Sequence, residues 1–407
     1  MAMTHVSAIS NARLRRAGRL QDILIGADGR IERLGPRLRP PKKGRIIDAQ
    51  GGLVLPSFVD AHLHLDLAYS LDLVKPNKSG TLLEAIRHWD EAKRRLTPEN
   101  VRERAVRAIR AEAAFGTGFI RTHVDVGTNA GLRLADGVLA AREACKDLVD
   151  VQIAVFPQDG ILRDPGAYEQ MRTALEKGCN LVGGIAHHER TADDSRRHIE
   201  MLFDLAADFD ADIDCHIDES DDPLSLCTEY LAAQAIKRGW QGRVTASHVC
   251  ALSSYDNAHA AKVVALLREA GISVVTNPQV NMHLEGRYDG YPKRRGLTRV
   301  RELLDKGVNV AVGQDCINDP FYPFGTGQML DVAHMLVHAD HLAAPRQIEQ
   351  VVDAITSGGA RALGVTRYGV AAGCSADLVV LPVETVPEAI RLRPPPKHVL
   401  KRGRLVH

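Results

Sequence analysis

The sequence lacks an excess of either charge and contains few aromatic residues. Its 407 residues include 52 Lys and Arg against 51 Asp and Glu, and Phe, Trp and Tyr together make up only 4%. A nucleic-acid surface needs a basic excess, and binding of single strands relies on aromatic rings on which bases stack. Because both features are missing, we expect no nucleic-acid partner and a small-molecule substrate instead.

Paired cysteines and long apolar segments are also missing. The seven cysteines include no Cys-x-x-Cys pair, which argues against a zinc knuckle, and their odd number argues against a disulfide framework. No segment approaches the ~20 apolar residues that span a bilayer. The first 16 residues contain no continuous apolar stretch of the kind found in signal peptides. We therefore expect a cytoplasmic protein with no membrane partner.

Short strands are predicted at both ends of the chain. Near the N-terminus, Asp28-Gly29 is a dipeptide typical of hairpin turns, and Lys401-Arg402-Gly403 is a second turn signal near the C-terminus. The segments around these turns are Asp22–Ile25, Asp377–Leu381, His398–Leu400 and Arg404–His407. We predict one small β-sandwich domain built from both termini, residues 1–54 plus 368–407.

The middle of the chain alternates between apolar, β-branched runs and helical stretches. One helix is marked at both ends, because Thr97 is a candidate N-cap before Pro98 and Gly116 is a stop signal. The apolar runs are Leu53–Ala61, Phe119–Val126, Val149–Phe156, Leu181–Ile185, Ala211–Cys215, Arg243–Ser247, Ile272–Thr276 and Val308–Val312. Eight buried strands separated by helices predict an α/β fold, a (β/α)₈ TIM-like barrel over residues 55–367.

Each apolar run ends in polar residues that can take part in chemistry. These residues are His62 and His64, His123 and Asp125, Gln158, His188 and Glu189, His216 and Glu219, His248, Asn277, Gln279 and Asn281, and Asp315. Active sites of (β/α)₈ enzymes are built at the carboxyl ends of the strands. The pattern therefore predicts one site at that end of the barrel.

A metal site is predicted from four of these strand ends. His62 and His64 are two residues apart on a strand, so they face the same side. The pair alone is a weak signal in a chain with 17 histidines, but His216 and Asp315 end the fifth and eighth runs. Three imidazoles and one carboxylate suit Zn²⁺ or Fe²⁺ and leave one coordination position open for water. Such an ion lowers the pKa of its bound water toward ~7.

Two further strand-end residues are candidates for proton transfer. Glu219 follows His216 by three residues, and a carboxylate beside an activated water can carry its proton to a leaving nitrogen. The acidic run Asp218–Asp222 also fits an exposed loop. His248 can polarise the water or an oxyanion, although a single strand-end histidine is often only hydrogen-bonded in place.

Several longer motifs resemble the amidohydrolase superfamily, and within it the bacterial cytosine deaminases. The matching segments are Leu55–Asp66, Arg121–Val126, Ala154–Gln158, His216–Glu219, Thr245–His248, Gly286–Gly296 and Asp315–Thr326. They occur in the same order as in the family and cover nearly the whole chain. The block Gly286–Gly296 is much more specific than the His-x-His pair.

The resemblance implies a role for each candidate residue. His62, His64, His216 and Asp315 match the ligands of one divalent metal ion per subunit, Zn²⁺ or Fe²⁺. Glu219 matches the proton shuttle, and His248 and Asp315 match the residues that orient the nucleophile. Gln158 matches a glutamine whose carboxamide reads the amide edge of a pyrimidine, because it offers one donor and one acceptor.

The implied reaction is hydrolytic deamination of a free aminopyrimidine base, cytosine or a 5-substituted cytosine such as 5-methylcytosine, with release of ammonia. Cys316 departs from the family pattern, which has a second Asp directly after the metal-binding Asp. We hypothesise that Cys316 faces C5 of the ring and favours an apolar substituent there. A homo-oligomer is also expected, and the roles of His123, Asp125 and His188 are left open.

Three other classes of function compete with this one. Cyclic-amide hydrolases with two metals need a lysine at the end of the fourth strand, and Leu181–Glu189 contains none. Hydrolases of creatinine, isoguanine-like purines or N-alkylated triazines share the ligands and stay open as alternatives. A non-catalytic scaffold usually shows lost ligands, whereas all are present here.

Overall fold

A computed structural model describes residues 4–15, 17–41 and 44–406. Residues 1–3 and 16 of the N-terminal segment, and His407 of the last predicted strand, lie outside the described residues. Within the described ranges, no helix is both long and apolar enough to cross a bilayer.

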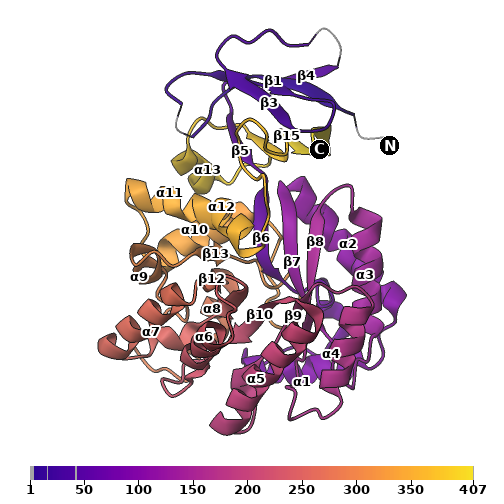
Figure 1. The fold of residues 1–407 in the computed structure, drawn as a ribbon, viewed down its shortest axis with the longest axis vertical. Helices are drawn as coiled ribbons and strands as arrows, with labels where there is room; N and C mark the ends of the chain where they lie inside the picture. Colours follow the sequence, from indigo (N-terminus) through magenta and orange to yellow (C-terminus); the bar gives the residue numbers. More distant parts are fainter. Residues whose placement is uncertain (1–3, 16, 42–43, 407) are drawn as a thin grey trace.

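The centre of the molecule is a barrel of eight parallel strands (Figure 1). Each strand pairs with the next along the chain, and a bridge between Leu63 and Asp315 joins the first strand to the segment after the last. The strands are β6 (Phe58–Leu63), β7 (Thr117–Asp125), β8 (Asp150–Phe156), β9 (Leu181–Val182), β10 (Asp212–Ile217), β11 (Val244–His248), β12 (Ser273–Thr276) and β13 (Val310–Val312). The predicted (β/α)₈ barrel is confirmed.

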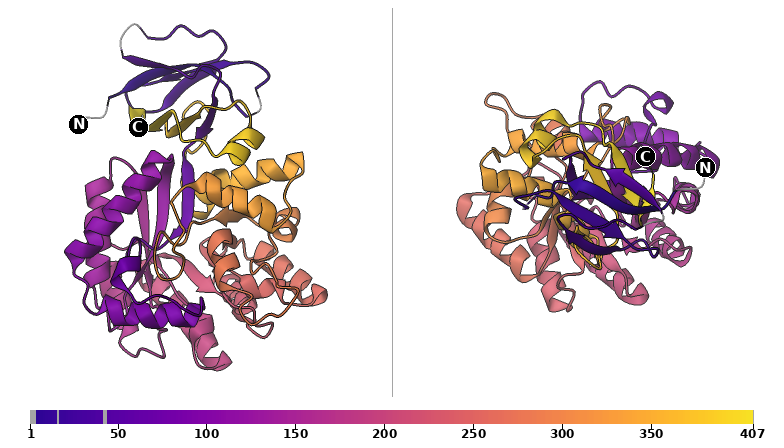
Figure 2. Two further views of the ribbon diagram at one scale, coloured as in Figure 1. Left: turned by 180° about the vertical axis from the view of Figure 1, so that it is seen from behind. Right: turned by 90° about the horizontal axis from the view of Figure 1, so that it is seen from above.

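Helices surround the barrel (Figure 2). The predicted helix is α2 (Pro98–Ala114), where the Thr97 side chain accepts a hydrogen bond from the Asn100 backbone N–H and Pro98 occupies the first turn. The other helices of the barrel region are α1 (Leu82–Lys93), α3 (Arg133–Cys145), α4 (Ala167–Glu176), α5 (Ala192–Phe209), α6 (Cys227–Lys237), α7 (Asn257–Glu269), α8 (Pro278–Leu284), α9 (Val300–Asp305), α10 (Met329–Ala339), α11 (Pro345–Ala354) and α12 (Ser357–Ala362).

Two four-stranded sheets built from both termini form the predicted small β-sandwich, which lies at the amino end of the barrel strands (Figure 1). One sheet has the order β3-β2-β1-β4 and the other β16-β15-β14-β5. Their strands are β1 (Val6–Ala12), β2 (Gln21–Ile25), β3 (Ile31–Gly35), β4 (Arg45–Asp48), β5 (Leu53–Pro56), β14 (Leu378–Leu381), β15 (His398–Lys401) and β16 (Arg404–Leu405), with α13 (Val386–Leu392) between β14 and β15. A shared apolar core joins residues of both ends, among them Ile9, Ile23 and Leu378.

Two predicted strands differ from those observed. The run Leu53–Ala61 is divided at Ser57, whose N–H donates to the Asp377 carbonyl, so β5 joins the small sheets and β6 begins the barrel. The fourth barrel strand ends early, at Val182. A Cβ on Gly183 would lie 2.4 Å from the Val155 carbonyl oxygen, so the chain passes its neighbour too closely for a side chain.

Candidate active site

Four predicted metal ligands lie together at the carboxyl end of the barrel. His62 lies on β6 and His64 directly follows it, whereas His216 lies near the end of β10. The Nε2 atoms of His64 and His216 are 3.0 Å apart. Asp315 Oδ1 lies 3.6 Å from His62 Nε2 and 3.6 Å from His64 Nε2. Strands far apart in the sequence therefore bring three imidazoles and one carboxylate close together.

The backbone around Asp315 is held in an uncommon conformation. Asp315 has a φ of 67°, in the left-handed region that costs a non-glycine residue about 1–3 kcal/mol. Two backbone hydrogen bonds to β6 stabilise it: Asp315 N–H donates to the His62 carbonyl at 2.7 Å, and His64 N–H donates to the Asp315 carbonyl at 2.9 Å. The closure of the barrel and the position of this carboxylate thus depend on the same contacts.

The electrostatics of the four residues fit a divalent cation. Burial lowers the pKa of His64 to about 3 and lowers the pKa values of His62 and His216 well below their usual range, so the imidazoles are neutral and carry lone pairs. His62 Nε2 and Asp315 Oδ2 are buried and have no hydrogen-bond partner among the described residues. A buried acceptor without a partner costs free energy, and coordination to Zn²⁺ or Fe²⁺ would give both atoms a partner.

Glu219 and His248 lie beside this group. His248 Nδ1 is 3.3 Å from Glu219 Oε1 and 4.0 Å from Asp315 Oδ2. Both side chains are buried. Burial, together with the nearby carboxylate of Asp315, raises the pKa of Glu219 well above its usual value. Glu219 can therefore hold a proton near neutral pH, as a group that gives and takes protons must.

Two asparagines at the start of α8 orient His248. Asn281 Nδ2 lies 2.9 Å from His248 Nδ1, and Asn277 Nδ2 lies 3.4 Å from both ring nitrogens. From the sequence, these asparagines were only polar residues after the seventh strand. Their contact with His248 joins the start of α8 to the end of β11, and no short sequence pattern predicts such a contact.

A small inner pocket adjoins the ligand cluster and is lined by both residues predicted to bind substrate, Gln158 and Cys316. Cys316 Sγ lies 3.7 Å from Asp315 Oδ1, and burial raises the pKa of this thiol well above its usual value, so the side chain is uncharged. The free space amounts to about 20 Å³.

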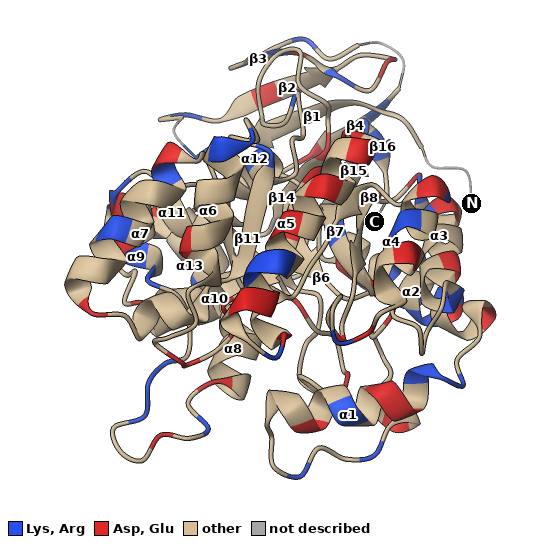
Figure 3. Ribbon diagram, turned by 60° about the horizontal axis from the view of Figure 1, so that its bottom comes forward, with Lys and Arg blue, Asp and Glu red and all other residues tan. Residues whose placement is uncertain are grey.

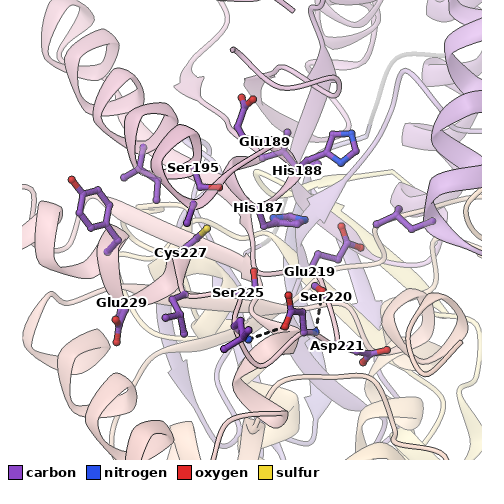
Figure 4. Close-up of a pocket in the computed structure, with 18 of the residues that line it drawn as sticks. His187, His188, Glu189, Ser195, Glu219, Ser220, Asp221, Ser225, Cys227 and Glu229 are labelled. Carbon is purple, nitrogen blue, oxygen red and sulfur yellow. Dashed lines mark hydrogen bonds between the residues drawn. The ribbon is translucent and has the colours of Figure 1, made fainter. Parts of the chain in front are cut away.

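A larger outer chamber of about 1030 Å³ shares Leu82, Glu219 and Leu284 with the inner pocket. Figure 4 shows part of its lining, including His187, Cys227 and Glu219. Leu82 begins α1, which lies at the end of the molecule away from the small β-sandwich (Figure 3). The same view shows that acidic and basic residues are interspersed along the surrounding helices.

The three strand-end residues of open role do not line the inner pocket. The ring of His123 packs on that of His62, with centroids 4.2 Å apart. Asp125 accepts a hydrogen bond from Lys93 Nζ at 2.9 Å, which makes it part of a buried ion pair. His188 lines the outer chamber.

Comparisons with known proteins agree with this arrangement. Residues 45–407 match the family model described as the amidohydrolase family. The fold is similar to a crystal structure of 5-methylcytosine deaminase from Klebsiella pneumoniae liganded with 5-fluorocytosine, with a TM-score of 0.94 and 40% identity over 98% of this chain and 97% of that one. The chain is 32% identical to a pterin deaminase of Rhizobium rhizogenes, over 96% of this chain and 88% of that protein. It is 30% identical to an N-isopropylammelide isopropyl amidohydrolase of a Pseudomonas species, over 98% of this chain and 96% of that protein.

Proposed function

This chain belongs to the amidohydrolase family and is a hydrolase acting on C–N bonds, and we propose that it deaminates a free aminopyrimidine base, cytosine or a 5-substituted cytosine such as 5-methylcytosine. The observation that carries the proposal is that Glu219 and His248 lie beside the candidate ligand Asp315 and line the same inner pocket as Gln158 and Cys316. The similarity to 5-methylcytosine deaminase supports it. A cytoplasmic location and a homo-oligomer stay predictions.

In this proposal, His62, His64, His216 and Asp315 hold one divalent ion per subunit, Zn²⁺ or Fe²⁺. When bound, such an ion lowers the pKa of a water and makes it a nucleophile at neutral pH. The donor set supports this assignment, because neutral imidazoles and a carboxylate suit either metal.

The protein side chains then direct the reaction at the amino-bearing ring carbon. Water attacks this carbon, and Glu219 takes a proton from the water and delivers it to the ring nitrogen. Glu219 then takes the remaining proton from the hydroxyl now bound to this carbon and supplies it to the amino group. The C–N bond breaks, the oxygen becomes a ring carbonyl, and ammonia leaves. His248, fixed by Asn281, and Asp315 orient the attacking oxygen, while the Gln158 carboxamide pairs with the amide edge of the ring.

A second candidate substrate is a larger amino-heterocycle. The outer chamber of about 1030 Å³ meets the inner pocket at Glu219, so a bicyclic ring or an N-alkyl group could extend into it. Pterin deaminase and N-isopropylammelide isopropyl amidohydrolase are relatives whose names indicate substrates of this kind.

An amine-release screen with metal-reconstituted protein tests the proposal. We expect ammonia from cytosine and 5-methylcytosine at kcat/KM values well above those for a pterin, an isoguanine-like purine, creatinine and an N-alkylated triazine. Turnover only of the larger rings would move the assignment to the second candidate. No turnover of any compound by protein with bound metal would refute a deaminase function.

Cys316 provides a prediction about the substituent at C5. The buried, uncharged thiol suits a methyl group, whereas a carboxylate in its place would face that methyl group with a charge. We expect Cys316→Asp to shift the ratio of kcat/KM for 5-methylcytosine to that for cytosine at least about tenfold toward cytosine, which corresponds to about 1.4 kcal/mol. Cys316→Ser is the uncharged control. A ratio unchanged by Cys316→Asp would contradict the contact with C5.

A further inference from the structure

The floor of the barrel beneath the candidate ligands contains a chain of buried polar groups. Ser247 Oγ lies 2.9 Å from His62 Nδ1 and donates a hydrogen bond to Asp214 Oδ1, also at 2.9 Å. Asp214 Oδ2 accepts from Arg121 Nη1 at 2.9 Å. All four side chains are at most 2% exposed. Ser247, Asp214 and Arg121 lie on β11, β10 and β7, so three other barrel strands hold the His62 side chain in place.

The direction of each hydrogen bond follows from the chemistry of its partners. A guanidinium only donates, so the Asp214 carboxylate accepts from Arg121 on one oxygen and from Ser247 on the other. The single hydroxyl proton of Ser247 is then committed to Asp214, and its oxygen accepts from His62 Nδ1–H. A neutral imidazole protonated at Nδ1 carries its lone pair on Nε2, which is the atom that faces Asp315.

We propose that Ser247 is a positioning residue that fixes the tautomer and ring orientation of His62 for metal binding, with Asp214 and Arg121 as its support. The proposal rests on the assignment of His62 as a metal ligand under the proposed function. The ring of His123, 4.2 Å from that of His62 and tilted by 32°, restricts the same imidazole from another side. Without the hydroxyl, the proton of His62 can move to Nε2 and block the lone pair.

Ser247→Ala tests the inference through metal affinity, which needs no substrate. Loss of a hydrogen-bond partner behind a ligand typically weakens metal affinity by about 10–100-fold, and we expect a loss of this size in competition with a chelator. The KM of the metal-saturated variant is expected to stay at the parental value, because Ser247 does not line the inner pocket. Ser247→Thr keeps the hydroxyl and is expected to retain metal as the parent does.

Thr245→Val is a matched control in the same floor. Thr245 precedes Ser247 by two residues on β11, and its hydroxyl accepts from Arg121 Nη1 at 3.1 Å without touching His62. We expect it to leave metal affinity unchanged, and both variants to have metal-free Tm values near that of the parent. Parental affinity in Ser247→Ala, an equal loss in Thr245→Val, or absence of metal binding by the parent would each overturn the inference. A protein whose affinity depends on Ser247 but which deaminates no base would refute the proposed substrate and leave this inference standing.

Discussion

Glu219→Gln is expected to lower kcat by about 10²–10⁴-fold while the protein keeps its metal, because proton transfer by a positioned side chain contributes acceleration of this size. The amide has nearly the same shape as the carboxylic acid but cannot pass a proton from the water to the ring nitrogen. Glu219 is buried, lines both the inner pocket and the outer chamber, and lies 3.3 Å from His248 Nδ1. Steady-state kinetics together with metal analysis would measure the effect.

Glu285→Gln is the matched control for this experiment. Glu285 is a neighbouring carboxyl whose pKa rises to about 8, because burial and the nearby carboxylate of Asp221 both disfavour its charge. It lines only the outer chamber. Since it is already largely protonated at neutral pH, we expect its amide variant to keep kcat within a few-fold of the parent. Full activity of Glu219→Gln, or similar losses in the two variants, would contradict a specific shuttle role for Glu219.

Lys93→Met is expected to lower the free energy of unfolding by about 3–5 kcal/mol, the typical loss when one partner of a buried ion pair is removed. The Lys93 side chain is fully buried at the end of α1, with Nζ 2.9 Å from Asp125 Oδ2 and 2.6 Å from Asp159 Oδ2. Burial alone would lower the pKa of Lys93, but the carboxylates of Asp125 and Asp159 raise it, so the side chain stays charged. The variant leaves two carboxylates close together without a cation.

Denaturant unfolding of the metal-free protein would measure this loss, and Lys75→Met is the control. Lys75 Nζ also lies 2.6 Å from a carboxylate, that of Glu91 on α1, but this ion pair is exposed. Removing it is therefore expected to have little effect on the free energy of unfolding. Equal stability of the two variants would show that burial adds nothing to the Lys93 pair. Asp159 directly follows Gln158, so we also expect a higher KM in Lys93→Met.

Much of the architecture could be predicted because its signals are local. The alternation of apolar runs and helices marks the eight strands, and the strand-end positions of His62, His216 and Asp315 follow from that pattern alone. The resemblance to the amidohydrolase superfamily, which the family match over residues 45–407 confirms, added roles that spacing could not assign. Glu219 is an example, because an acidic loop predicts exposure whereas the side chain is 6% exposed.

The parts that could not be predicted depend on contacts between distant segments. Ser247 is an ordinary strand residue in sequence, and only its approach to His62 and Asp214 gives it a function. The early end of the fourth strand similarly depends on how closely Gly183 passes Val155. Such features are set by the packing of neighbouring strands, which a single sequence does not encode in any short pattern.

The bridge between Leu63 and Asp315 has a consequence for how the protein is made. The first candidate ligands, His62 and His64, leave the ribosome early, whereas Asp315 follows the eighth barrel strand and is held by backbone hydrogen bonds to His62 and His64. A nascent chain therefore carries histidines that can bind metal loosely long before it has a complete site. We expect cellular metal selection to take place after synthesis, on a closed barrel, so that metal supply at that moment decides between zinc and iron.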